Sequence, residues 1–186
     1  MPSPLMQQLI ADHRNFAVFI DILEGQADRL EAGERTDLEV VEAILGYLHR
    51  YGDQCHHPRE DLLYAQLRQR HPQASEGTSG LEADHAQMHE ATKRLLHEVR
   101  TVCDGSELDA YALAQRLSGF VIHYRAHFDA ENEHLFPIAI AVFTPEDWKL
   151  IERLAAIMTS AERAMHVQER FHALRNYIHA IDRLNP

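Results

Sequence analysis

The sequence contains few of the residues that cross-link small folds or interrupt helices. Among its 186 residues are two cysteines, Cys55 and Cys103, with eight glycines and seven prolines. The two cysteines form no Cys-x-x-Cys pair, so we expect no disulfide framework, and a reducing cytoplasm is the default compartment. The glycines and prolines gather at a few breaks, which favours long helices between them.

Long apolar runs and clusters of basic residues are also missing. No apolar run approaches the roughly 20 residues that span a bilayer. The first twelve residues lack the basic start and apolar stretch of a signal peptide. Against 18 basic side chains stand 29 acidic ones, for a formal net charge of −11. Such a surface repels nucleic acid and anionic membranes, so we expect neither as a partner.

Apolar residues recur with helical spacing between the breaks. The pattern predicts an all-α protein with helices over about 5–31, 37–70, 79–103 and 107–136, followed by a helical region over 145–183. Short connections make neighbouring helices antiparallel, which predicts an up-down-up-down four-helix bundle. We therefore expect residues 1–140 to form the bundle. Residues 141–186 would form an extension that packs on it or joins two chains in a homodimer.

Histidine is what the sequence has in excess, with 14 residues. Each of the four predicted helices carries histidine in its apolar stripe. In three of them a second candidate ligand follows at i+4, on the same face and about 6 Å further along the axis. The resulting set is His13, His56, Glu60, His85, His89, His127 and Glu131.

A lone core histidine is more often a packing residue than a ligand, and His-x-x-x-Glu pairs arise by chance on solvated helices. Seven such side chains buried together without metal would lack hydrogen-bond partners. Helix turns spaced in this way suit two ions about 3.5–4 Å apart that share a carboxylate. We therefore interpret the set as a two-metal centre.

The remaining histidines rank lower. His57 follows His56 but lies about 100° further around an α-helix, so we expect it to flank the site. His123, one turn before His127, is a candidate to replace a ligand. Surface or packing positions are expected for His49, His97, His134, His166, His172 and His179.

A ferritin-like di-iron site is an alternative, because that class uses Glu-x-x-His motifs. Glu82-x-x-His85 and Glu131-x-x-His134 match the spacing. These motifs lie on successive predicted helices, however, and Glu82 and His134 fall outside the apolar stripes. The loop of about ten residues after the second helix is also too short for a long crossover.

The chain resembles the hemerythrin-like family of HHE cation-binding domains over about residues 5–140. The matching residues are Asp12-His13, the run His56-His57-Pro58-Arg59-Glu60-Asp61, His85-x-x-x-His89, and His127-x-x-x-Glu131 followed by Leu135-Phe136-Pro137. In one respect it departs from the oxygen-carrying hemerythrins, which have His-x-x-x-x-Asp in the fourth helix. Here the carboxylate is Glu131 at i+4, and Asn132 holds the i+5 position.

The resemblance implies a non-heme centre of two iron ions bridged by Glu60 and Glu131. One iron would take His85, His89 and His127. The other would take His13 and His56, which leaves an open position for a small diatomic ligand such as dioxygen. Imidazole and carboxylate ligands suit iron, although zinc or manganese also binds such sets.

Three functions follow from this interpretation. The favoured one is a binding protein that carries, senses or scavenges dioxygen or nitric oxide, or handles iron. The second is a di-iron enzyme that turns over peroxide, dioxygen or nitric oxide. The third is a structural or signalling module in which the metal serves stability. A fold does not decide among them.

Overall fold

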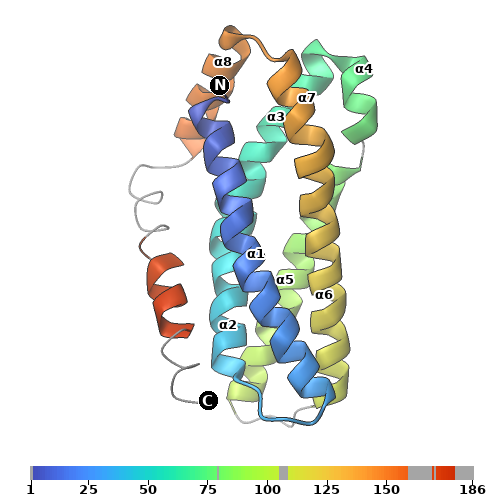
Figure 1. Ribbon diagram of the computed structural model, residues 1–186, viewed down its shortest axis with the longest axis vertical. Helices are drawn as coiled ribbons and strands as arrows, with labels where there is room; N and C mark the ends of the chain where they lie inside the picture. Colours follow the sequence, from blue (N-terminus) through green and yellow to red (C-terminus); the bar gives the residue numbers. More distant parts are fainter. Residues whose placement is uncertain (1, 79, 105–108, 159–168, 170, 179–186) are drawn as a thin grey trace.

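The computed structural model of the chain describes residues 2–78, 80–104, 109–158, 169 and 171–178. Four long helical rods run side by side (Figure 1), and the described residues include no strand. The predicted all-α four-helix bundle is confirmed. Its elements are α1 (Pro4–Glu31), α2 (Leu38–Tyr47), η1 (Leu48–His56), α3 (His57–Arg70), α4 (Pro72–Ser75), η2 (Glu76–Thr78), α5 (Leu81–Cys103), α6 (Ala110–Ala130), η3 (Glu131–Leu135), α7 (Phe136–Val142) and α8 (Pro145–Met158).

Polar side chains define where three of these helices begin. Ser3, Asp37 and Asp109 each accept a hydrogen bond from the backbone amide three residues on, at 3.2, 3.1 and 2.9 Å. Such caps supply partners to amides of the first turn, which have none inside the helix.

Two of the four rods contain π-helical segments. Elements α2, η1 and α3 form the second rod, and α6, η3 and α7 form the fourth. The fourth rod continues to Val142 rather than ending near residue 136. Pro137 does not stop it, because this proline falls in the first turn of α7, where its missing N–H costs little.

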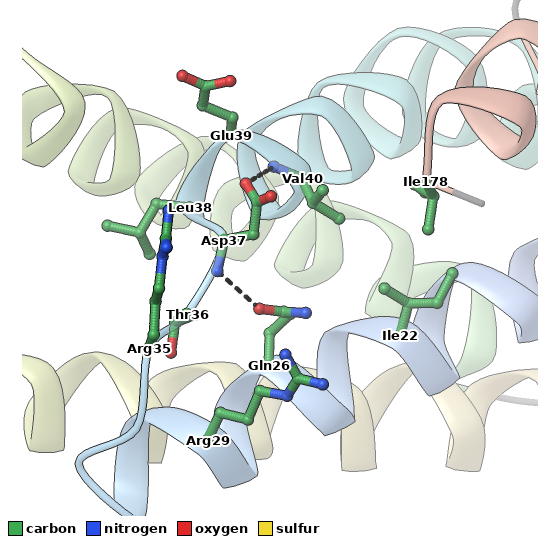
Figure 2. A pocket seen from close by; sticks show the side chains of 10 residues that line it. All are labelled: Ile22, Gln26, Arg29, Arg35, Thr36, Asp37, Leu38, Glu39, Val40 and Ile178. Carbon is green, nitrogen blue, oxygen red and sulfur yellow. Dashed lines mark hydrogen bonds between the residues drawn. The ribbon is translucent and has the colours of Figure 1, made fainter. Parts of the chain in front are cut away.

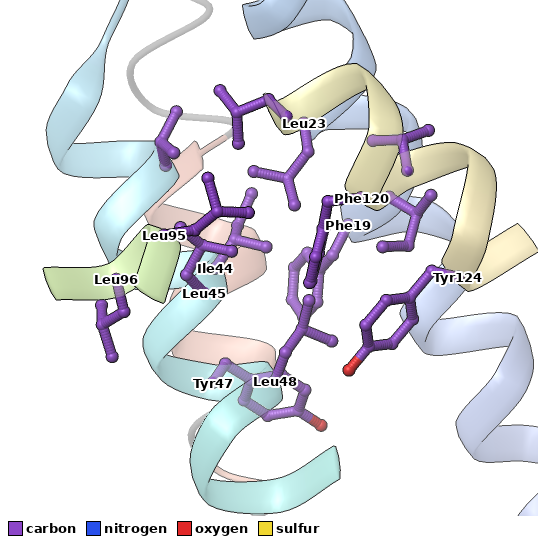
Figure 3. Packing of buried hydrophobic residues seen from close by; sticks show 14 of the residues in the cluster. Phe19, Leu23, Ile44, Leu45, Tyr47, Leu48, Leu95, Leu96, Phe120 and Tyr124 are labelled. Atoms are coloured by element: carbon purple, nitrogen blue, oxygen red, sulfur yellow. The ribbon is translucent and has the colours of Figure 1, made fainter. Parts of the chain in front are cut away.

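Apolar side chains form two clusters along the bundle. The larger one lies among α1, α2, α5 and α6 and includes Phe19, Leu23, Leu48 and Phe120 (Figure 3). The other joins the start of α1 to α3, α7 and α8; it includes Leu9, Leu63, Tyr64, Leu135 and Ile151. In α1, His13 lies between Leu9 of one cluster and Phe16 of the other.

The C-terminal region packs partly on its own bundle. In α8, Ile151 and Ala155 are buried, while Ile157 is 81% exposed. Residues 171–178 are helical, and the Phe171 ring lies 5.1 Å from that of Phe19. The rest of the predicted region, with His166 and His179, lies outside the described residues. Within the described ranges, no helix is both long and apolar enough to cross a membrane.

Candidate metal centre

Six of the seven residues predicted as ligands converge between the two apolar clusters. They come from all four rods, and each has at most 7% of its surface exposed. The six are His13 of α1, His56 of η1, Glu60 of α3, His85 of α5, His127 of α6 and Glu131 of η3.

These six residues form two overlapping groups. One consists of His13, His56 and Glu60, and the other of Glu60, His85, His127 and Glu131. Within each group, the potential ligand atoms lie within 4.8 Å of one another. Because Glu60 belongs to both groups, its carboxylate lies where it can join two ions.

The two oxygens of Glu60 face different groups. Oε1 lies 3.1 Å from Nε2 of His13 and 3.0 Å from Nε2 of His56. Oε2 lies 3.7 Å from Nε2 of His85. A carboxylate with one oxygen toward each group is able to contact a cation in either one.

Glu131 faces both groups as well. Its Oε2 lies 3.4 Å from Nε2 of His13 and 3.3 Å from Nε2 of His127. Its Oε1 lies 3.5 Å from Nε2 of His85 and accepts a hydrogen bond of 2.9 Å from the Tyr64 hydroxyl. Glu131 therefore lies close to histidines of both groups.

Side-chain oxygen atoms lie near the Nδ1 atoms of the histidines, on the side away from the centre, and orient the imidazole rings. Three Nδ1 atoms are within hydrogen-bond distance of a side-chain oxygen. The distance is 3.1 Å from His13 to Asn132, 3.2 Å from His56 to Asp12 and 2.8 Å from His85 to Asp61. Nδ1 of His127 lies 3.8 Å from Asp84. When Nδ1 donates its proton outward, Nε2 presents its lone pair to the centre, which is the usual arrangement behind metal-bound histidine.

A cation fits this donor set. Nε2 of His56, Oε2 of Glu60 and Oε2 of Glu131 are buried and have no hydrogen-bond partner. The Nε2 atoms of His85 and His127 face each other at 3.1 Å. Buried polar atoms ordinarily have partners, and a metal ion would supply one to all of them at once.

Without metal, the site holds protons. Burial works against the charged imidazole of His13, but Glu131 and Glu60 outweigh it and raise its pKa to about 10. Burial likewise opposes charge on His85, and Asp61 and Glu131 raise its pKa to about 10. Burial favours the neutral carboxyl of Glu131, yet the histidines, His127 first, hold its pKa well below the usual range.

His57 also belongs to this region, although we expected it to flank the site. It is only 2% exposed, and its ring stacks on that of His85 with centroids 4.4 Å apart and planes at 6°. Its ring centroid lies 6.1 Å from that of His127. Burial, together with His85 and His56, lowers its pKa well below 6.5, which favours the neutral ring that metal binding requires. Its nitrogens do not belong to either group of converging ligand atoms.

The π-helical segment η1 explains this difference. Hydrogen bonds in a π-helix run from i to i+5, so each turn holds more residues than an α-turn. Side chains adjacent in sequence then diverge by a smaller angle. His56 is the last residue of η1 and His57 the first of α3, and both side chains are buried. The expectation for His57 assumed an unbroken α-helix.

His89 lies elsewhere than in the centre. The buried face of α5 passes through His85, Met88 and Thr92, and the His89 side chain is 37% exposed. Its Nδ1 lies 3.2 Å from Oδ2 of Asp53 rather than beside Glu60 or Glu131. The structure thus separates His89 from the other six predicted residues.

The lower-ranked residues stay outside the two groups. His123 is half-buried, whereas His97, His134 and His172 are exposed. Glu82 forms an ion pair with Arg68 at the surface. Neither Glu82 nor His134 belongs to the groups of converging ligand atoms, so the geometry does not support the ferritin-like alternative.

A surface pocket lies at the end of the bundle where α1 turns into α2 (Figure 2). Arg29, Arg35 and Glu39 are among its lining residues, and the Asp37 amide donates to Gln26 at 3.0 Å. None of the described residues that line it is a histidine or cysteine. The pocket is therefore separate from the metal centre.

Comparison with known families agrees with this geometry. The family model described as the hemerythrin HHE cation binding domain matches residues 5–139. The matched range covers most of the chain and includes all six converging residues and His57. No curated protein and no solved structure matches the chain. The chain belongs to the hemerythrin family of HHE cation-binding domains.

Proposed function

We propose that the chain binds a pair of iron ions bridged by Glu60 and Glu131. His13 and His56 would hold one ion, and His57, His85 and His127 the other. The observation that carries this proposal is the sharing of Glu60 between two groups of buried ligand atoms. His57 takes the place first given to His89, because His57 is buried against His85 and His89 is not.

The two ions would have unequal surroundings. The first has two histidines and the second three, so the first keeps an open position. Aromatic rings lie beside the two histidines of the first ion. The ring centroids of Phe128 and Phe136 lie 4.4 and 5.0 Å from that of His13, and the ring centroid of Phe16 lies 4.9 Å from that of His56. An apolar enclosure favours a small neutral molecule over a charged one.

A surface pocket gives access to this side of the centre. It is lined by residues of α1 and α6 with Asn132, and it includes His13, Ile10 and Phe128. His13 itself is only 4% exposed. A passage that leaves so little of His13 accessible suits a diatomic molecule, and we propose dioxygen or nitric oxide as the ligand.

Reversible binding is favoured over turnover by what surrounds the open position. The rings of Phe128 and Phe136 beside His13, and of Phe16 beside His56, carry no group able to give or take a proton, whereas multi-step reduction of dioxygen needs protons. When bound, a pair of ferrous ions supplies the electrons and the open coordination position that dioxygen binding requires. The protein contributes the ligands, their orientation and the exclusion of water.

The experiment is iron loading without oxygen, followed by exposure to dioxygen and, separately, to nitric oxide. We expect a new visible absorption band that disappears when the gas is removed under vacuum. A Glu60→Gln protein, treated in the same way, is the control and should give no such band. Irreversible oxidation with multiple turnovers would indicate the enzyme instead, and loaded protein without any spectral change would exclude both.

A further inference from the structure

A second group of metal-ligand side chains lies beside the buried centre. It consists of His49 and Asp53 of η1 and His89 of α5. Nδ1 of His49 and Nδ1 of His89 each lie 3.2 Å from the same oxygen, Oδ2 of Asp53. The two imidazole rings are 5.3 Å apart, and the three potential ligand atoms lie within 4.8 Å of one another.

The carboxylate at the base of this group is buried, while its histidines reach solvent. The Asp53 side chain has no exposed surface, and those of His49 and His89 are 24% and 37% exposed. Oδ1 of Asp53 is buried without a hydrogen-bond partner, 3.6 Å from Nδ1 of His57. The other oxygen, Oδ2, is the one that faces the two imidazoles. The group therefore combines a buried carboxylate with two imidazole nitrogens, a donor set that suits a cation.

We propose that His49, Asp53 and His89 form a separate metal site. Two imidazoles and one carboxylate make up a three-ligand set that first-row divalent ions such as Zn²⁺, Co²⁺ and Fe²⁺ accept. The exposed histidine edges leave the remaining positions to water. The site therefore exchanges its ion with solvent, in contrast to the enclosed pair.

The test counts cobalt ions on protein whose buried centre has first been loaded with iron and from which loosely bound iron has then been removed. Co²⁺ is added without oxygen, and its d–d absorption and equilibrium dialysis give the bound equivalents. We expect one equivalent on the wild type. His49→Ala and His89→Ala should each weaken its binding by at least about tenfold and leave the iron of the buried centre unchanged. His97→Ala, an exposed histidine on the same helix as His89, should change neither value.

The measured quantity is the difference between the wild type and His49→Ala. This difference does not depend on how many ions the buried centre holds. The experiment can therefore contradict the proposed outer site without contradicting the proposed iron pair, and the reverse. Wild-type protein that binds no additional cobalt would overturn the proposal. So would loss of buried iron in His89→Ala but not in His49→Ala, because His89 would then be a ligand of the enclosed centre. Far-ultraviolet circular dichroism checks that each variant remains helical.

Discussion

At the scale of single residues, the carboxylates decide whether the proposed pair of ions can form. Glu60→Gln keeps the shape of the side chain but removes the negative charge that two ions would share. We expect the loaded variant to lose the magnetic coupling between its irons and to hold fewer than two per chain. Glu98→Gln, which alters a surface ion pair with Arg116, is the matched control. A coupled pair that persists in Glu60→Gln would rule out Glu60 as a bridge.

The position of His57 differs from the one that a regular α-helix predicts. Its ring lies against His85 in the core, so we expect His57→Ala to lower iron occupancy mainly at the ion held by His85 and His127. His134→Ala removes an exposed histidine and should leave occupancy as it is. Iron content and Mössbauer spectra of the two variants test this. Full iron occupancy in His57→Ala would mean that His57 is not a ligand and that another histidine binds this ion.

Protons should compete with metal over an unusually wide range of pH. The pKa values of His13 and His85 are raised to about 10 in the metal-free protein, so both rings carry protons at neutral pH. Metal must displace these protons, and apparent affinity should therefore rise as pH increases toward 10, by about tenfold per pH unit for each proton displaced.

Competition with a chelator for Zn²⁺ or Co²⁺ between pH 6.5 and 8.5 measures this dependence. Ordinary histidines, with pKa values of about 6.5, would give an affinity that levels off above pH 7. Such a plateau would show that the carboxylates do not hold protons on His13 and His85.

At the scale of helices, the apolar pattern was sufficient to predict four rods and their order. It also placed six ligand candidates on inward faces, because a regular repeat is reliable wherever the helix is regular. It did not indicate the burial of His57, where the helix changes type. His57 follows a π-helical segment, and the residue pattern does not reveal the i to i+5 hydrogen bonds of that segment. A constant rotation of about 100° per residue therefore gives the wrong direction for the His57 side chain.

His89 illustrates a different limit. It lies on a regular α-helix, one turn from His85, and the spacing alone fits a ligand pair. Which side chain enters the core depends on how α5 is rotated against its neighbours. That rotation follows from the packing of Met88 and Thr92, which sequence spacing does not determine. The same packing leaves His89 beside Asp53.

Helix α8 should contribute to the stability of the bundle. Ile151 is 1% exposed and belongs to the same cluster as Leu63 and Leu135. Ile151→Ala should lower the free energy of unfolding by about 2–5 kcal/mol, the range for deleting a buried isoleucine side chain. Ile157→Ala removes an exposed side chain and should change it by less than about 0.5 kcal/mol. Urea unfolding monitored by circular dichroism gives the free energy of unfolding of both variants. Equal values would mean that α8 does not pack on the bundle as described.

At the scale of the whole molecule, the fold places an enclosed polar centre between two apolar clusters. The clusters hold four rods in register, and the register brings ligands from every rod to one depth. Most residues of the bundle therefore act on the metal only by fixing these positions. A homodimer through the C-terminal region remains a prediction, since the contacts described here are those of one chain with itself.

The iron content of His49→Ala protein shows whether the enclosed centre holds two ions. This variant lacks a ligand of the outer site, so its iron reports on the enclosed centre alone. After loading and removal of loosely bound metal, elemental analysis against protein concentration should give two irons per folded chain. A value of one or fewer, with the chain fully folded, would contradict the account.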